Sequence, residues 1–238
     1  MREIYKSDGK QYNSEPAIIS LTSWKKRINT AGKSIYGLMK MCPGFHIVLV
    51  LNTVEFPNML YDMPKDIQLF VKNKCIEILW LNKDYKVFQK VLFTIDKYRN
   101  VPVISSDDDN YPKINYAKEL YDEWSKTKDT FISYWGRPYK NTIHLGGNFT
   151  IFPPYAFGKY GLECLNDKVI DTREDDPYYT VLRTKMSGTK CRVLKRRVSD
   201  VIKYHDCIEP LQNIYRNRPK NWAIYRIEEA LEEYEFNK

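Results

Sequence analysis

The chain has 238 residues, enough for one large α/β domain with a substantial core or for two small domains, and we predict one. Hydrophobic residues make up 43% and charged residues 29%, within the ordinary range of globular proteins. The net charge of +8 favours anionic partners such as nucleotide diphosphates, nucleic acid or an acidic membrane surface, without choosing among them.

The cysteines and the apolar runs bear on location. The five cysteines are scattered, odd in number and without a CxxC pair, so we expect reduced thiols and a cytoplasmic protein. The segment Met1 to Lys6 lacks the apolar stretch of a signal peptide, and the longest aliphatic run, Ile47 to Leu51, is too short to cross a bilayer. We therefore expect a soluble protein or one peripheral to a membrane.

In the first half of the chain, apolar runs alternate with amphipathic segments. Strands are predicted at Ala17–Thr22, His46–Leu51, Glu77–Leu81 and Val101–Ile104, and helical segments at about Ala31–Met41, Met59–Tyr61 and Val87–Tyr98. This order predicts a mainly parallel, GT-A-like or Rossmann-like sheet with helices on both faces, which binds ligands beyond the carboxyl ends of its strands. The polar segments Ser20 to Arg27 and Ser105 to Asp109 fall at such ends.

The second half is less regular and reads as a smaller antiparallel or irregular extension. It offers helices at Tyr116–Trp124, up to about Arg183 and at about Trp222–Tyr234, and a strand at Phe131–Trp135. Within one domain we expect a nucleotide-binding half over about 17–112, an acceptor and catalytic half over about 113–205, and a helical tail over about 206–238.

Three consecutive aspartates, Asp107, Asp108 and Asp109, follow the strand that ends near Ile104. Carboxylates this close repel unless a cation neutralises them, and their oxygens suit Mg²⁺ or Mn²⁺. An acidic surface turn is the alternative, since Asp and Asn are ordinary turn residues. In an extended segment Asp107 and Asp109 would share a face while Asp108 points elsewhere, for example toward a ribose.

Four segments in this order resemble those of bacterial GT-A-type glycosyltransferases, in particular a group of small proteins from polysaccharide gene clusters. They are Ile18 to Ile28, Val103 to Pro112 with its DxD triplet, Gly146 to Pro154, and Glu174 to Asp176. The resemblance covers roughly residues 17–200. It implies transfer of a sugar from a nucleotide-sugar, with a UDP-linked donor expected, to a cell-surface glycan or a lipid-linked oligosaccharide, with Mn²⁺ or Mg²⁺ as cofactor.

The resemblance also implies roles on the donor side. Asp109 would be the direct metal ligand, with Asp107 or Asp108 holding the nucleotide. Thr22 and Arg27 lie where family members contact the nucleotide, and a guanidinium suits phosphate, while Lys25 and Lys26 are weaker candidates that solvation explains equally well. Lys90 matches a lysine often found in the helix before the DxD strand, although a lysine on an amphipathic helix commonly faces solvent. 

A late histidine completes the metal shell in some GT-A enzymes, and His205 is the candidate here; a structural role is the alternative. We assign neither His46 nor His144 to a metal.

A second acidic site would remove the proton from an acceptor hydroxyl, and Asp175 and Asp176 are the candidates. Such base catalysis implies inversion at the anomeric carbon. The alternative is helix capping, because these acids precede Pro177 and a predicted helix. Gly146 and Gly147 allow a close backbone approach to a ligand, or simply a strand bend.

The stretch from Arg183 to Lys203 carries eight Lys/Arg and one Asp. It would suit an anionic membrane surface where lipid-linked acceptors reside, or it is a solvated face. Among competing functions, a nucleotidyl or phosphoryl transferase would also use carboxylate-held Mg²⁺. A basic, aromatic-rich nucleic-acid binder would leave the acidic triplet unexplained, so no nucleic acid is expected.

Overall fold

The computed structural model describes residues 5–186, 189–205, 218–219, 221–232 and 234–236. In this part of the chain the strands are β1 (Tyr5–Gly9), β2 (Ile18–Thr22), β3 (His46–Asn52), β4 (Glu77–Leu81), β5 (Val103–Ser105), β6 (Asn110–Pro112), β7 (Thr130–Ser133), β8 (Gly136–Tyr139), β9 (Thr142–Leu145), β10 (Thr150–Phe152), β11 (Lys190–Val193) and β12 (Ile202–Tyr204). The helices are α1 (Ile28–Met41), α2 (Lys65–Lys72), α3 (Gln89–Lys97), α4 (Tyr116–Ser125), α5 (Tyr160–Glu163), α6 (Asp167–Ile170), α7 (Asp175–Lys185), α8 (Val198–Val201) and α10 (Trp222–Ala230), with 3₁₀ turns η1 (Met59–Asp62) and η2 (Lys86–Phe88).

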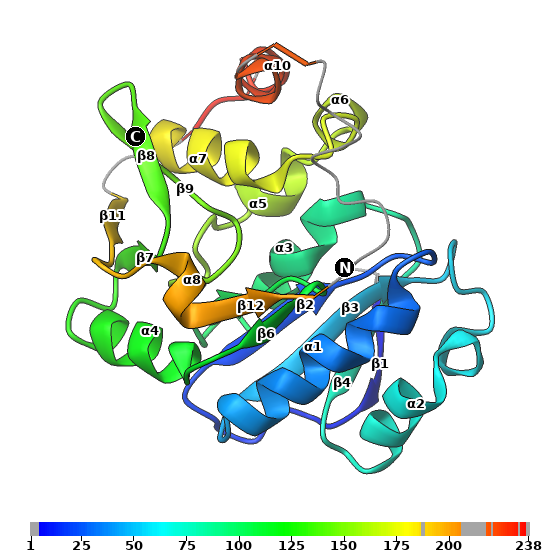
Figure 1. Cartoon of the computed structure of the whole chain (residues 1–238). Helices are drawn as coiled ribbons and strands as arrows, with labels where there is room; N and C mark the ends of the chain where they lie inside the picture. The colour runs from blue at the N-terminus through cyan, green and yellow to red at the C-terminus, as the bar shows by residue number, and fades with distance from the viewer. Residues whose placement is uncertain (1–4, 187–188, 206–217, 220, 233, 237–238) are drawn as a thin grey trace.

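Eight of the described strands form one sheet in the order β1-β4-β3-β2-β5-β10-β7-β11 (Figure 1). The strands β4, β3, β2 and β5 pair in parallel, and β11 is parallel to β7. The edge strand β1 and the inner strand β10 run antiparallel to their neighbours. Because β10 reverses between β5 and β7, the carboxyl ends of β2, β5 and β7 and the amino end of β10 share one edge, here called the carboxyl edge.

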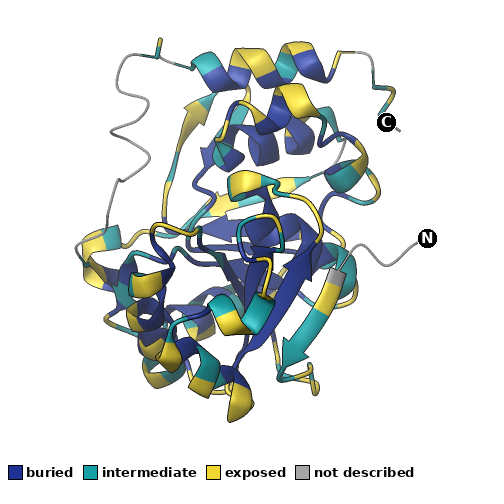
Figure 2. Cartoon of the chain, turned by 90° about the vertical axis from the view of Figure 1, so that its right-hand side faces the viewer, coloured by how far each residue is buried: buried dark blue, intermediate teal, exposed yellow. Residues whose placement is uncertain are grey.

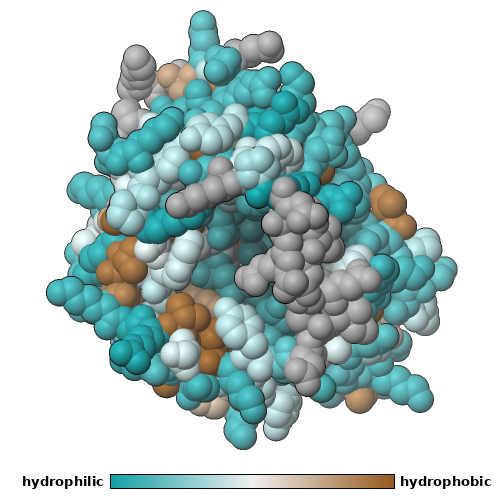
Figure 3. Space-filling view, turned by 45° about the horizontal axis from the view of Figure 1, so that its top comes forward, coloured by the Kyte–Doolittle hydropathy of each residue, from teal (hydrophilic) through white to brown (hydrophobic). Residues whose placement is uncertain are grey.

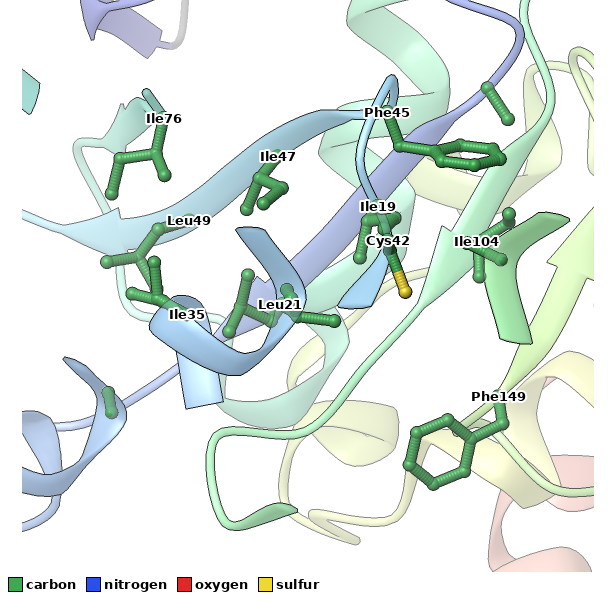
Figure 4. Close-up of a cluster of buried hydrophobic side chains, with 14 of the residues drawn as sticks. Ile19, Leu21, Ile35, Cys42, Phe45, Ile47, Leu49, Ile76, Ile104 and Phe149 are labelled. Atoms are coloured by element: carbon green, nitrogen blue, oxygen red, sulfur yellow. The ribbon is translucent and has the colours of Figure 1, made fainter. Parts of the chain in front are cut away.

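Two hydrophobic cores lie on opposite faces of this sheet. In β2, Ile19 and Leu21 belong to the core under α1, whereas Ile18 points into the core on the α3 side. Figure 4 shows Ile35 of α1 close to Leu21 and Leu49. The central strands are buried and the outer sides of the helices are exposed (Figure 2). Burial on both faces explains the continuous apolar runs of the parallel strands.

The predicted α/β fold with a mainly parallel central sheet is confirmed, and the strand Glu77–Leu81 was predicted with its observed bounds. The edge strand β1 and the helix α2 were missed. The β1 sequence, YKSDG, is polar because its side chains bond rather than pack: Trp80 Nε1 donates to Asp8 Oδ2 at 2.8 Å, and Ser7 donates to Glu77. Hydrophobic periodicity does not reveal such a strand.

None of the helices in the described ranges is long and apolar enough to span a bilayer.

Candidate active site

The aspartate triplet lies at the carboxyl edge, where β5 ends at Ser105 and Asp108 and Asp109 form a turn. Asp107 Oδ1 lies 3.0 Å from Lys90 Nζ. Asp108 and Asp109 both contact Arg27, with 3.0 Å between Arg27 Nη2 and Asp109 Oδ2. The expectation that Asp107 and Asp109 share a face while Asp108 points elsewhere is therefore wrong. It assumed an extended chain, and a turn does not alternate its side chains.

Arg27 reaches the triplet from the amino end of α1, where it is the N-cap residue and is buried. Ser23 Oγ donates to Asp108 Oδ2 at 2.6 Å. Burial raises the pKa of Asp108 to about 6, even though the Arg27 charge and the Ser23 hydrogen bond lower it. The segment from Ser23 to Arg27 thus packs against the aspartate triplet. Lys25 and Lys26, by contrast, are exposed.

Thr22, at the end of β2, uses its hydroxyl for the protein itself. Its Oγ1 donates to the carbonyl of Val50 at 2.7 Å and accepts from Gln89 Nε2 at 2.7 Å. These hydrogen bonds join β2 to β3 and α3, beside the segment that was predicted to contact the nucleotide. Gln89, which sequence reasoning missed, is buried and precedes Lys90 in the helix.

Lys90 connects two acidic groups that are far apart in the sequence. Its Nζ lies 3.0 Å from Asp107 Oδ1 and 3.0 Å from Asp175 Oδ2, and the side chain is buried. Burial lowers the pKa of Lys90. The negative charges of Asp107, Asp175 and Asp176 raise it by a larger amount, so the net shift is upward and the ammonium group stays charged. Lys90 does not face solvent, and the alternative given for it above is wrong.

Asp175 and Asp176 occupy the first turn of α7 and face the carboxyl edge. Asp176 Oδ1 accepts a hydrogen bond from the N–H of Gly147, which leads into β10. A Cβ atom at Gly147 would lie 2.2 Å from Asp176 Oδ1, so a side chain at this position would displace the carboxylate. Burial and the neighbouring Asp175 raise the pKa of Asp176.

The start of α7 bears out part of the capping alternative. The N-cap residue of α7 is Glu174, and its side chain makes no capping hydrogen bond. Asp175 and Asp176 do lie in the first turn, where the helix dipole favours negative charge. Their carboxylates, however, contact Lys90 of α3 and the Gly147 backbone.

His205 is brought to the triplet by a short antiparallel pairing. β12 pairs with β6, which directly follows the triplet. The His205 N–H donates to the Asp109 carbonyl at 3.0 Å, while His205 Nε2 lies 2.8 Å from Ser34 Oγ of α1. Within the described residues, no three His, Cys, Asp or Glu side chains form a ready metal-binding group.

Trp135 is a further residue at the carboxyl edge that the sequence analysis did not single out. It follows β7 and leaves 42% of its surface exposed, although it lies next to Gly146. The signal in the sequence was a tryptophan at the end of a predicted strand.

Figure 3 looks onto the molecule from the α10 side and shows a hollow near the centre of that face, bordered mainly by hydrophilic residues.

The basic stretch is partly neutralised by α4. Arg192 Nη2 lies 2.8 Å from Glu123 Oε2, and Arg196 Nε lies 3.2 Å from Glu119 Oε1. Lys190 pairs with Asp129 at 3.0 Å. These exposed pairs add little stability, but they lower the positive charge that the stretch presents.

A mainly parallel sheet with helices on both faces and acidic groups gathered at its carboxyl edge defines a GT-A-like α/β fold. No protein-family model and no curated protein matches this sequence. Solved structures do match. One is Staphylococcus aureus TarS residues 1–349 in complex with UDP, with a TM-score of 0.55 and 11% identity over 92% of this chain and 66% of that one.

A second structure of S. aureus TarS matches with a TM-score of 0.52 and 10% identity over 93% of this chain. The chain spans 66% of the shorter TarS fragment and 40% of the longer one. WbbM, described as a bifunctional glycosyltransferase, is more distant, with a TM-score of 0.47 and 9% identity. At these identities the similarity to TarS establishes the fold.

Proposed function

We propose that this protein is a metal-dependent glycosyltransferase that moves a sugar from a UDP-linked donor to a cell-surface glycan or lipid-linked acceptor, with inversion. The proposal rests on one observation: the Lys90 ammonium group contacts both Asp107 of the triplet and Asp175 of α7. The triplet provides a donor side, and Asp175 and Asp176 provide an acceptor side. The reaction needs both, because it stabilises a departing diphosphate and deprotonates a hydroxyl.

The donor set fits Mn²⁺ or Mg²⁺. Arg27 contacts Asp108 and Asp109, and Lys90 contacts Asp107 and Asp175. Carboxylates clustered in this way suit a divalent ion, which commonly takes one or two protein carboxylates and completes its shell with substrate phosphates. Asp109 and Asp107 would hold the ion, with His205 beside them. When bound, the ion would neutralise charge on the leaving diphosphate.

Arg27 and Lys90 would bind the phosphates of the donor. Both are buried cations at the carboxyl edge, where α/β sheets bind ligands. A phosphate oxygen can replace an aspartate as the partner of a guanidinium or ammonium group. Asp108 would orient the rest of the nucleotide, and Thr22 would act indirectly, by joining β2 to β3 and α3 beside the site. That the TarS fragment of similar fold was solved in complex with UDP supports a nucleotide ligand for this fold.

Asp175 or Asp176 would act as the general base. The acceptor oxygen gives its proton to this carboxylate and attacks the anomeric carbon from the face opposite the diphosphate, whose bond to that carbon breaks, so the new glycosidic bond has inverted configuration. The anomeric configuration of the product, read from its NMR coupling constant, tests this step. A product that retains the donor configuration would rule out direct displacement assisted by these aspartates.

The first experiment is a thermal-shift assay with UDP, GDP and CMP, each with and without Mn²⁺. We expect UDP with Mn²⁺ to stabilise the wild type, and Asp109→Ala to abolish the effect. Asp122→Ala is the matched control, because Asp122 lies on α4 and pairs with Lys118 on the surface. If no nucleotide stabilises the protein, the nucleotide-donor assignment fails and phosphoryl transfer or nucleic-acid binding becomes the better hypothesis.

We place the protein in the cytoplasm, peripheral to the inner face of the membrane. The basic stretch supports this, although α4 neutralises part of its charge. Sedimentation with vesicles containing anionic phosphatidylserine should recover the protein at low salt and lose it at high salt. A protein that ignores these vesicles at low salt is not held at the membrane by this stretch.

A further inference from the structure

We propose that Trp135 is the platform on which an acceptor sugar stacks, so that the acceptor is a cyclic pyranose with one apolar face. This inference rests on the proposed function and specifies its acceptor class. The starting point is that large apolar side chains are buried on average. The indole is one of the largest apolar side chains, yet 42% of Trp135 is exposed.

The exposed ring is held in place. The backbone of Trp135 is fixed, since its main-chain N–H donates to Ser133 Oγ at 3.2 Å and its carbonyl accepts from the Gly146 N–H at 3.1 Å. The ring meets buried His144 edge to face, with 5.8 Å between centroids. The backbone hydrogen bonds and the contact with His144 thus fix the position of the exposed indole. A fixed flat surface binds at a low cost in conformational entropy.

Gly146 lets the ring lie close against the backbone. A Cβ atom at this position would lie 3.0 Å from Trp135 Cε3, closer than side chains normally pack. The next residue, Gly147, binds Asp176. The indole is therefore separated from the proposed base by a two-glycine segment that carries no side chain.

A chain of contacts places this platform on the acceptor side. Asp107 contacts Lys90, Lys90 contacts Asp175, and the neighbouring Asp176 contacts Gly147. Trp135 lies at the far end of this series from the triplet. A donor held at the triplet would thus have the aspartates of α7 between it and the indole, which is where an acceptor hydroxyl must be deprotonated.

The chemistry of the indole face selects the ligand class. The ring face carries partial negative charge, and the axial C–H groups on one side of a pyranose carry partial positive charge. Stacking leaves the hydroxyls at the ring edge free for Asp175 or Asp176. An acyclic polyol phosphate has no comparable flat apolar face and carries a charge that gains nothing from an indole.

The test uses the full chain labelled with 5-fluorotryptophan, and the spectrum of Trp135→Phe assigns the Trp135 resonance. The probes are the methyl β-pyranosides of glucose, galactose and N-acetylglucosamine, with glycerol 3-phosphate as the acyclic comparison. We expect at least one pyranoside to shift the Trp135 resonance in the presence of UDP and Mn²⁺. If none does, or if only glycerol 3-phosphate does, the proposal is overturned.

Turnover separates this proposal from the proposed function. Trp135→Ala should leave acceptor-free hydrolysis of the UDP-sugar within about twofold of wild type and raise the KM for the pyranoside roughly fivefold to tenfold. Trp135→Phe should restore most of the loss, and Trp135→Leu should not. Tyr155→Ala is the matched control, because Tyr155 is equally exposed but follows the opposite end of β10.

Three results would contradict a stacking role: an unchanged KM in Trp135→Ala, an equal loss of acceptor-free hydrolysis, or a Leu variant as good as Phe. Failure of wild type to bind UDP or hydrolyse any UDP-sugar would instead refute the proposed function.

Discussion

At the scale of single residues, the cations decide how the acids of the site are arranged. Arg27 holds Asp108 and Asp109, and Lys90 holds Asp107 and Asp175. The sequence suggested both cations as candidates, but it could not show which carboxylate each one contacts. That pairing depends on the turn at Asp108 and Asp109 and on the position of α3.

Lys90 should be essential to the stability of the site. Lys90→Met would leave Asp107 and Asp175 close together without their shared cation, so we expect unfolding to become easier by about 3 kcal/mol. Urea denaturation at pH 7 measures this. Lys118→Met, at an exposed pair on α4, should change the free energy of unfolding by at most about 0.5 kcal/mol. Equal effects of the two substitutions would show that Lys90 is not a buried ion-pair partner.

His144 should make the fold sensitive to mild acid. Burial, with Arg137 and Arg183 nearby, lowers its pKa to about 4 from 6.5. Since the unfolded chain binds a proton at higher pH than the folded one, stability contributed by the neutral ring is present above pH 6.5 and falls as the pH drops toward 4. Between pH 7 and pH 5 this group should cost wild type about 2 kcal/mol.

The check on His144 is a pair of urea titrations at pH 7 and pH 5 for wild type and His144→Phe. The variant should lose less stability over this interval because it lacks the imidazole. The other titrating groups are present in both proteins, so their contributions cancel in the comparison. If both proteins lose the same amount, His144 is not held neutral by the fold.

At the scale of elements, the site forms where β5, β10, α3 and α7 converge. The order of strands and helices predicted that polar segments gather at the carboxyl edge, since parallel strands end together there. The sequence predicted an antiparallel or irregular extension in the second half, but not that antiparallel β10 lies inside the main sheet, where Gly147 reaches the first turn of α7. It also missed β12, a three-residue strand too short to show a period.

Gly147 should be required for the contact between β10 and α7. In Gly147→Ala the new Cβ would displace Asp176, so we expect sugar transfer to fall at least about tenfold and stability to fall by about 1–3 kcal/mol. Binding of UDP, measured by calorimetry, should persist.

Gly161→Ala is the control for tight packing alone, because its Cβ would lie 3.1 Å from Phe157 Cβ. It should cost stability without the loss of transfer. Transfer at the wild-type rate in Gly147→Ala would show that the position of Asp176 does not matter for the reaction.

At the scale of the whole molecule, a second polar cluster connects several elements at the edge of the sheet opposite the carboxyl edge. Glu77 of β4 is fully buried and receives hydrogen bonds from His46, Lys97, Ser7 and Tyr98, with His46 Nε2 2.7 Å from Glu77 Oε2. These groups come from β3, α3, β1 and the residue after α3. His46 thus helps to hold β3 and β4 together through Glu77.

Glu77 should contribute stability that acid removes. Burial raises its pKa, but the hydrogen bonds from His46, Lys97, Ser7 and Tyr98 outweigh burial and bring it to about 2 from 4.5. The stability is fully present above pH 4.5 and is lost as the pH falls toward 2. At pH 7, Glu77→Gln should lower the free energy of unfolding by about 3 kcal/mol.

Urea denaturation of wild type and Glu77→Gln at pH 7 and pH 3.5 should show the difference narrowing at the lower pH. Glu229→Gln, at an exposed pair on α10, serves as the control and should show no such trend. A difference that stays constant over this range would mean that the carboxylate charge of Glu77 is not what stabilises the fold.

The sequence by itself determined the alternation of strands and helices, the parallel sheet and the acidic candidates, because these depend on local periodicity and residue type. Tertiary structure decided which groups meet. Lys90 and Asp175 are far apart in the sequence, and only the packing of α3 against the sheet, with α7 above the carboxyl edge, brings their charges to 3.0 Å. Trp135 shows the same division, since its residue type is visible in the sequence, but only the tertiary structure brings it against Gly146 and His144.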